Sequence, residues 1–296
     1  KLELMIPQQI LNSLNDFFTK QLSHLKGDIL QHSLSGGSIN EAFRINKGKE
    51  RFFLKYNHAD LYPGMFEKEA AGLKMLHTTG EIDVPEVIHF GNSGDYSFLL
   101  LTYIEQGKEK SNFWMEFAKQ LAALHSHKAP QFGLDYDNYM GSLYQHNTFH
   151  NRWINFFIQE RLERQVRLAR DRGNISSADV SAIERLYKKL EEIFPETKPS
   201  LVHGDLWSGN FMINENGLPS LIDPAVYYGH PEVDIAMSTL FGGFADSFYE
   251  TYNQSNPLEK GWQQRLDYYN LYPLMIHVNL FGESYLRAVR RIIQKF

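Results

Sequence analysis

Three side chains that carry oxygen atoms, Asp205, Asn210 and Asp223, stand out in the C-terminal half of the sequence. The first two lie in the segment HGDLWSGN, residues 203–210. Mg²⁺ prefers hard oxygen ligands, and one carboxylate with one amide oxygen leaves room for phosphates and waters. A second carboxylate that stays off the metal can orient a hydroxyl group and accept its proton. These residue types suit phosphoryl transfer, with Asp205 as base and Asn210 and Asp223 as metal ligands.

The sequence between Asn210 and Asp223 predicts how these two residues meet. Phe211–Asn214 and Ser220–Asp223 have strand-like compositions, and Glu215-Asn216-Gly217 between them is typical of a turn with glycine at positive φ. Antiparallel pairing brings the two far ends together, in the order that kinases use for a catalytic Asp, a metal-binding Asn and a later metal-binding Asp. The alternative is ordinary turn and capping chemistry, in which Asp and Asn are common. The hairpin register favours the metal site.

Two neighbours of Asp205 have two readings each. His203 either braces the loop through hydrogen bonds, which we prefer, or forms a metal pair with Asp205 for hydrolysis, although no further histidines cluster nearby. Trp207 either stacks on an acceptor substrate or anchors the loop by packing. The sequence does not decide between the two roles of Trp207.

A lysine on a strand and a glutamate on a helix are expected to meet in the N-terminal part. Period two places Phe53 and Lys55 on the same face of an apolar strand. In the following helix, Glu69 falls within an apolar stripe that includes Phe66, Ala70 and Leu73. A carboxylate on a buried stripe needs a cationic partner, so we predict a Lys55–Glu69 pair that positions ATP rather than a lysine with its head in water.

Two further segments are assigned to ATP by their place in the order of elements. Gly36, Gly37 and Ser38 lie between the first two expected strands, where a turn would cover the phosphates, although the segment lacks a G-x-G-x-x-G pattern. Thr102, Tyr103 and Ile104 are expected to hold the adenine, because their backbone lies at the link between the two parts of the chain.

The elements that position these residues follow from apolar spacing. An opening helix is predicted from about residue 10 to 22, and Met65–His77 has helical period again. Strands are predicted at 29–34, 41–45, 51–56, 86–90 and 97–103. Beyond residue 104 the pattern is mostly helical, at about 111–127, 150–172, 176–193, 232–241 and 261–293. We expect an α+β fold with an N-terminal lobe of five antiparallel strands and a helix (1–103), and a mostly helical lobe (104–296) that holds the catalytic and acceptor sites.

Composition limits the classes of function. The chain has 296 residues and a formal charge of −5, which gives no sign of a nucleic-acid partner. It has no cysteine, so disulfides and thiolate sites are excluded. No apolar run is long enough to span a membrane, and Lys1–Pro7 lacks the apolar segment of a signal peptide. We expect a cytoplasmic monomer without a membrane partner.

With these residues identified, the sequence resembles the fructosamine kinase (ketosamine 3-kinase) family, within the aminoglycoside-phosphotransferase branch of the protein-kinase-like fold. The resemblance covers nearly the whole chain. Its most specific parts are HGDLWSGN at 203–210, Asp223-Pro224-Ala225, and YGHPEVDIAM at 228–237. Some relatives carry a cysteine in the glycine-rich turn for redox control by a disulfide, which this chain cannot form.

The resemblance implies transfer of the ATP γ-phosphate to the 3-hydroxyl of a ketosamine, free or bound to protein. The 3-phosphate then eliminates spontaneously and frees the amine, so the activity serves deglycation. By similarity Asp205 accepts the proton, Asn210 and Asp223 bind Mg²⁺, and Lys55 with Glu69 positions ATP. Asp234, at the start of a helix, braces the catalytic loop or serves as a simple N-cap.

Two alternatives remain open. The same fold could act on an aminoglycoside, choline or another hydroxyl acceptor. A cationic antibiotic calls for an acidic helical lobe, whereas residues 150–172 carry six arginines, whose simplest interpretation is a solvated basic face: Arg152, Arg161, Arg164, Arg167, Arg170 and Arg172. A pseudokinase that binds nucleotide as a scaffold is the non-enzymatic alternative, disfavoured because base, metal ligands, lysine and glutamate are all present.

Overall fold

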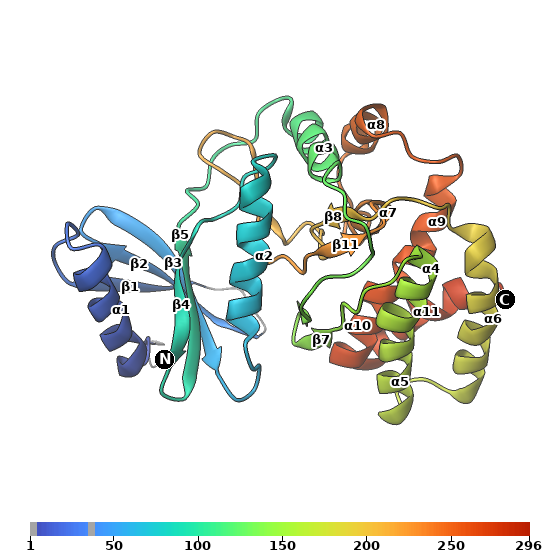
Figure 1. The fold of residues 1–296 in the computed structure, drawn as a ribbon, viewed down its shortest axis with the longest axis horizontal. Helices are drawn as coiled ribbons and strands as arrows, with labels where there is room; N and C mark the ends of the chain where they lie inside the picture. Colours follow the sequence, from blue (N-terminus) through green and yellow to red (C-terminus); the bar gives the residue numbers. More distant parts are fainter. Residues whose placement is uncertain (1–4, 35–38) are drawn as a thin grey trace.

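A five-stranded antiparallel sheet forms the N-terminal part of the computed structural model, which describes residues 5–34 and 39–296. The strands lie in the order β1-β2-β3-β5-β4, so all five predicted strands are confirmed (Figure 1). Their bounds are β1 (Ile29–Leu34), β2 (Glu41–Lys47), β3 (Glu50–His58), β4 (Val87–Ser93) and β5 (Tyr96–Thr102).

Helices cover both faces of this sheet. Helix α1 (Gln8–Gln21) packs its apolar side on the face that carries Phe52 and Leu54 of β3. Helix α2 (Met65–Thr79) lies on the opposite face, between the sheet and the C-terminal part (Figure 1). Alternation along β3 therefore points Lys55 toward α2, as its period of two predicts.

The C-terminal part is mainly helical. Its helical elements are α3 (Phe113–Leu124), α4 (Trp153–Phe156), the π-helical η1 (Phe157–Leu162), α5 (Glu163–Asp171), α6 (Ser177–Ile193), α7 (Glu232–Met237), α8 (Asp246–Ser255), α9 (Trp262–Tyr269), α10 (Leu271–Phe281), the 3₁₀ turn η2 (Gly282–Ser284) and α11 (Leu286–Ile293). Short antiparallel pairs join β6 (Asn138–Met140) to β7 (Leu143–Gln145), β8 (Ser200–Val202) to β11 (Tyr227–Gly229), and β9 (Phe211–Ile213) to β10 (Pro219–Leu221).

The larger hydrophobic core continues from α2 into the C-terminal part. It contains Phe66, Leu73 and Leu76 of the predicted stripe together with the buried residues of the C-terminal helices. At Gly72 an added Cβ would lie 3.1 Å from a methyl group of Val226, so α2 packs directly against the chain just after Asp223. This contact fixes the helix that carries Glu69 against the segment that carries Asp223.

Several helix predictions differ from the structure. The helix predicted at 232–241 ends at Met237, and the one predicted at 261–293 is three helices, broken after Tyr269 and at Gly282, where φ is +79°. Helix α8 was not predicted, because only Phe248 and Tyr252 of its ten residues are buried. The remaining predicted helices are present, although 150–172 contains the π-helical turn η1.

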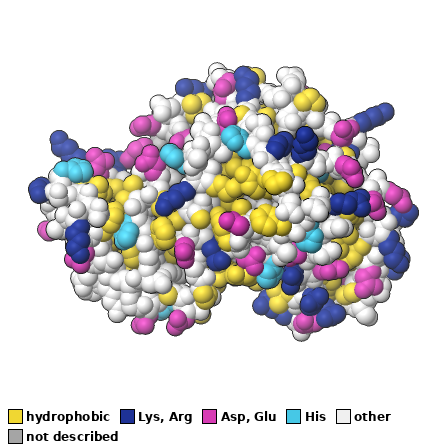
Figure 2. All heavy atoms as spheres, viewed as in Figure 1, with side chains coloured by type: hydrophobic (Ala, Val, Ile, Leu, Met, Phe, Trp, Pro, Cys, Tyr) yellow, Lys and Arg dark blue, Asp and Glu magenta, His cyan; other side chains and the backbone are white. Residues whose placement is uncertain are grey.

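Charged side chains of both signs are mixed over the face drawn in Figure 2, and apolar side chains gather near its middle. Lysine and arginine are most numerous toward the end formed by α5 and α6. Within residues 5–34 and 39–296, no helix combines the length and apolarity that a membrane crossing requires.

Candidate active site

The predicted hairpin brings Asn210 close to Asp223. Phe211 of β9 pairs with Leu221 of β10, and the N–H of Ile222 donates to the carbonyl of Asn210 at 3.0 Å. The turn depends on Gly217, whose φ is +70°. Because the pairing continues to Ile222, Asn210 lies next to the residue that precedes Asp223.

Asp234 holds the loop that carries the candidate base. Its carboxylate accepts the backbone N–H groups of His203 at 2.7 Å and of Gly204 at 2.9 Å, and the side chain is buried. Burial alone would raise the pKa of Asp234, but its hydrogen bond to His125 and other favourable contacts hold the pKa below its usual range. The predicted brace is therefore present. The N-cap alternative is wrong, because Pro231 occupies that position of α7.

His203 is a neutral brace of the same loop. Its Nδ1 accepts the N–H of Asp205 at 3.2 Å, which leaves Nε2 to donate to the carbonyl of Ile222 at 2.9 Å. Burial lowers the pKa of His203. Its preferred interpretation is confirmed. Across the described chain, no group of three or more His, Cys, Asp or Glu side chains is arranged for a metal.

Asp205 is held by its backbone and has a basic carboxylate. The side-chain amide of Asn210 donates to the carbonyl oxygen of Asp205 at 2.8 Å. Burial raises the pKa of Asp205 to about 7, opposed by Asn210 and reinforced by the charge of Asp223. A carboxylate with a raised pKa is a better proton acceptor than an ordinary aspartate.

Lys55 lies between two carboxylates. Its Nζ is 2.5 Å from Oε1 of Glu69 on α2 and 2.7 Å from Oδ1 of Asp223. Burial lowers the pKa of Lys55, but the charges of Asp223 and Glu69 outweigh it and the pKa lies above its usual value. Burial also raises the pKa of Glu69 to about 7 despite Lys55. The predicted Lys55–Glu69 pair is confirmed, and Asp223 joins it from the other part of the chain.

Asp223 has an unusual backbone and an open side chain. Its φ is +52°, a strained conformation for a residue with a side chain, and such strain concentrates at functional sites. The carboxylate of Asp223 is 53% exposed. Burial within the site would raise the pKa of Asp223, but the charge of Lys55 outweighs this and keeps the pKa below its usual value. The amide nitrogen of Asn210 already donates a hydrogen bond, so Asn210 would offer its oxygen to a metal. Together with the exposed carboxylate of Asp223, this makes an all-oxygen donor set that fits Mg²⁺.

Gly204 allows the loop to lie against the segment that follows Asp223. Its φ is +83°, and an added Cβ would lie 2.1 Å from the carbonyl oxygen of Ala225. The N–H of Ala225 also donates to the carbonyl of His203 at 2.9 Å. The base and the candidate metal carboxylate are thus carried by two segments packed backbone to backbone.

The nucleotide end of the site is only partly described. The N–H of Thr102 donates to the carbonyl of Glu86 at 3.0 Å, and that of Tyr103 to the carbonyl of Arg51 at 3.4 Å. No hydrogen bond among the described residues uses the backbone of Ile104, and its predicted role in holding adenine stays a prediction. Gly36, Gly37 and Ser38, predicted to cover the phosphates, lie outside the described residues.

Trp207 packs beside the catalytic loop. Its ring lies 5.6 Å from that of Phe241 at 80°, and a Cβ at Gly209 would lie 2.3 Å from the indole. Phe241 in turn lies 5.0 Å from the ring of His277 on α10. The packing role of Trp207 is therefore present, and the stacking role remains a prediction.

Sequence reasoning missed a buried pair behind Asp234. Nε2 of His125 lies 3.1 Å from Oδ2 of Asp234, and Nδ1 lies 2.6 Å from the hydroxyl of Tyr252. The two come from α8 and the end of α3, and nothing in their local sequence marks them. Asp234 thus accepts three hydrogen bonds, from His125 and from the backbone N–H groups of His203 and Gly204.

The Fructosamine kinase family model matches residues 10–296. A protein from Enterococcus faecium named "Probable ketoamine kinase" is 42% identical over 265 residues, which cover 88% of this chain and 93% of that protein. Such coverage extends over both parts of the fold.

Two solved structures are similar to this chain over nearly its whole length. A crystal structure assigned as a fructosamine-3-kinase from Haemophilus somnus superposes with a TM-score of 0.86 at 32% identity, covering 95% of this chain and 96% of that chain. The aminoglycoside phosphotransferase APH(4)-Ia superposes with a TM-score of 0.62 at 14% identity, covering 97% and 98%. At that identity the second comparison shows the fold alone, which is the protein-kinase-like fold expected from the sequence.

Proposed function

The chain belongs to the fructosamine kinase family, and we propose that it transfers the γ-phosphoryl group of ATP to the 3-hydroxyl of a ketosamine, such as a fructosamine or ribulosamine. The observation that carries the proposal is the contact of Lys55 with both Glu69 and Asp223. This contact joins Lys55, the cation proposed to face the nucleotide, to the segment of Asp223, which packs against the loop of Asp205. A phosphate donor and a hydroxyl acceptor would meet at that junction.

In this proposal Asp205 orients the acceptor hydroxyl and takes its proton. A bond forms between the acceptor oxygen and the γ-phosphorus, the bond from that phosphorus to the β–γ bridging oxygen breaks, and ADP leaves. The raised pKa of Asp205 suits the proton transfer. Lys55 would place its charge on the ATP phosphates, where it offsets the negative charge of the transferred group.

Asn210 and Asp223 are the proposed Mg²⁺ ligands. When bound, the metal would neutralise phosphate charge and hold the phosphates in place. Asp223 contributes an exposed carboxylate, and the bond from Asn210 to the Asp205 carbonyl fixes the plane of its amide. This ties the orientation of the amide ligand to the loop that bears the base.

Several finer assignments belong with this proposal. Loss of phosphate from the 3-phosphate would free the amine, which is the deglycation role implied by the family. Gly36, Gly37, Ser38 and Thr102–Ile104 are retained as the ATP-binding segments, and Trp207 as an acceptor contact. A lobe boundary near residue 103, a monomeric state and a cytoplasmic location are inferences from the sequence.

An ATP-consumption screen tests the acceptor. The purified chain is assayed with fructosamines, ribulosamines, an aminoglycoside, choline and simple amino alcohols, with Asp205→Ala as the matched control. We expect turnover with the ketosamines only, and an Asp205→Ala rate at least about 10³-fold lower with Mg-ATP affinity within about tenfold, because the base acts on the acceptor. Turnover with only the other acceptors would contradict the substrate assignment, and lost nucleotide binding in Asp205→Ala would contradict the role as base.

A further inference from the structure

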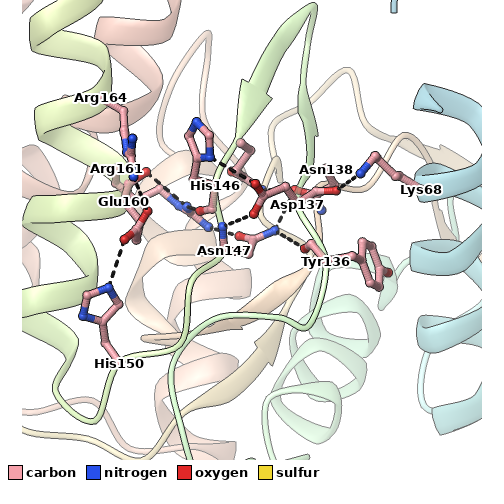
Figure 3. Close-up of polar contacts among 11 residues, drawn as sticks. Lys68, Tyr136, Asp137, Asn138, His146, Asn147, His150, Glu160, Arg161 and Arg164 are labelled. Atoms are coloured by element: carbon pink, nitrogen blue, oxygen red, sulfur yellow. Dashed lines mark hydrogen bonds and ion pairs between the residues drawn. The ribbon is translucent and has the colours of Figure 1, made fainter. Parts of the chain in front are cut away.

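The β6–β7 hairpin, together with its flanking residues 136–147, contacts both parts of the fold. Toward the N-terminal part, Nζ of Lys68 on α2 donates to the carbonyl of Asp137 at 2.5 Å (Figure 3). The hydroxyl of Tyr139 donates to the carbonyl of Pro63, just before α2, at 3.1 Å. Lys68 is the immediate neighbour of Glu69. The hairpin is therefore attached to the helix that provides the Lys55 partner.

The opposite side of the hairpin holds the segment after Asp223. Nδ2 of Asn138 donates to the carbonyl of Val226 at 2.9 Å, and Nε2 of Gln145 donates to that of Ala225 at 3.1 Å. Asn138 and Gln145 are both buried and are bonded to each other at 2.8 Å. Buried amides in a satisfied network hold their partners in one geometry, because any shift leaves a polar group unpaired.

The hub of this network is Asn147, which is fully buried. Its Nδ2 donates to Oδ1 of Asn138 at 3.0 Å and to the carbonyl of Tyr136 at 3.1 Å, and its backbone N–H donates to Asp137 at 2.8 Å. Its Oδ1 accepts from Nη2 of Arg161 at 2.7 Å (Figure 3). Asn147 therefore links Arg161 to Asn138 through hydrogen bonds, so the position of Asn138 depends on that of Arg161.

Arg161 is an arginine with no exposed surface, which corrects the expectation of a solvated basic face for this residue. Its guanidinium donates to the carbonyl of His146 and lies 4.4 Å from the ring of Phe156, 4.1 Å from that of Tyr227 and 5.3 Å from that of Tyr272. Aromatic faces stabilise a desolvated cation. Among the described residues no carboxylate lies within ion-pair distance of it. The charge of Arg161 therefore stabilises the local structure through these contacts.

The π-helical turn η1 presents Arg161 to the hairpin. Glu160, Arg161 and Leu162 are three consecutive buried residues. Oε1 of Glu160 lies 3.0 Å from Nε2 of His150, whereas the side chain of Arg161 points toward the hairpin (Figure 3). A π-turn inserts one residue into a helix and redirects its side chains, and such turns are frequent at functional sites.

We propose that Arg161, Asn147 and Asn138 are positioning residues for Asp223, and that the hairpin couples α2 to the Asp223 segment. The proposal rests on the proposed role of Asp223 as a Mg²⁺ ligand. The path runs from Arg161 through Asn147 and Asn138 to the carbonyl of Val226, three residues after Asp223. Glu69 and Asp223 are thereby linked twice, by an ion pair through Lys55 and by neutral hydrogen bonds through the hairpin.

Asn138→Ser and Lys68→Met test the two sides of the hairpin. Measurements are the Mg²⁺ concentration at half-maximal rate, the acceptor KM, and the Tm increase on adding Mg²⁺ with a nonhydrolysable ATP analogue. Asn138→Ser should raise the half-maximal Mg²⁺ concentration by at least about tenfold, as loss of a contact behind a metal ligand does, with acceptor KM within about twofold. Lys68→Met should raise the half-maximal Mg²⁺ concentration by about threefold. Lys74→Met, on α2 over the ring of Phe90, is the control and should change nothing.

Arg161→Lys keeps the charge but loses the planar fork, and it should reproduce Asn138→Ser if the variant folds. An unchanged Mg²⁺ dependence in Asn138→Ser would overturn the inference. The inference would also be overturned if Asn138→Ser lowered the Tm of the ligand-free protein enough to explain the whole change in rate. The ligand-induced Tm increase needs no acceptor. If no ketosamine is turned over but Asn138→Ser still weakens that increase, the positioning role stands and the substrate proposal falls.

Discussion

The two ends of the candidate site are held in place differently. The loop of Asp205 is fixed within the C-terminal part by Asp234, which accepts two backbone N–H groups and contacts His125. Lys55 is fixed by ion pairs to Glu69 and Asp223, and the second of these reaches the other part of the chain. One end is a closed network, and the other is a charge with an exposed partner.

The difference indicates which end can rearrange. Asp234 accepts three hydrogen bonds from buried donors, so moving the loop would break several hydrogen bonds at once. Asp223 is half exposed, so its contact with Lys55 can be exchanged for solvent or a ligand at a lower cost. We infer that nucleotide binding adjusts the Lys55 end and leaves the loop unchanged. Variants at the two ends should therefore fail in different ways.

Lys55→Met should show the largest effect. It removes the cation proposed to face the ATP phosphates, so kcat/KM for ATP should fall by about 10²–10³-fold. The free energy of unfolding should fall by no more than about 1 kcal/mol, because the raised pKa of Glu69 lets this carboxyl take up a proton when its partner is lost. Steady-state kinetics and denaturant unfolding measure both, with exposed Lys49→Met as control. Unchanged ATP kinetics would remove Lys55 from the site.

Asp234→Asn should lower activity and stability together. The N–H groups of His203 and Gly204 donate to different carboxylate oxygens, and asparagine has an NH₂ group in place of one of them, so one N–H is left buried and unpaired. We expect a loss of about 2 kcal/mol in the free energy of unfolding and about 10²-fold in kcat, with KM for ATP little changed. If stability stayed intact while KM for ATP rose, the contrast between the two ends would be wrong.

Asp179→Asn, remote from both ends, should show the smallest effect. Arg290 holds the pKa of Asp179 below its usual range, with further help from Ser176 in a capping box that begins α6. The charged form therefore stabilises the fold at pH values above the unfolded pKa near ~4. The variant should lose about 1 kcal/mol at pH 7, and the difference should shrink progressively as the pH falls from the unfolded pKa toward the lowered folded pKa. Thermal unfolding across pH 2–7 measures this, and kcat should not change.

The sequence predicted best those features that local alternation or spacing determines. Strand β1 matches its predicted bounds, and β2 to β5 differ from theirs by a few residues at most, whereas β6, β7 and β11 were not predicted. Glu69 was predictable because a charged residue on an otherwise apolar helical stripe requires a partner. The hairpin was predictable because a glycine turn fixed which residues face each other.

Features that depend on distant segments could not be predicted. Arg161 has the sequence context of a solvated arginine, and its burial follows from Phe156, Tyr227 and Tyr272, which are widely separated along the chain. Lys55 was predicted to pair with Glu69, but the additional contact with Asp223 depends on how the two parts of the fold dock. The role of His125 follows from the same kind of long-range packing.

The close approach at Gly204 also bears on how this family can diversify. Even a methyl group there would collide with the carbonyl of Ala225, so the separation of the base from the metal segment cannot be tuned by substitution at this point. Trp207, the proposed acceptor contact, packs against Phe241 from a separate segment. Under the proposed function, acceptor range can change at these two residues while the separation at Gly204 stays fixed.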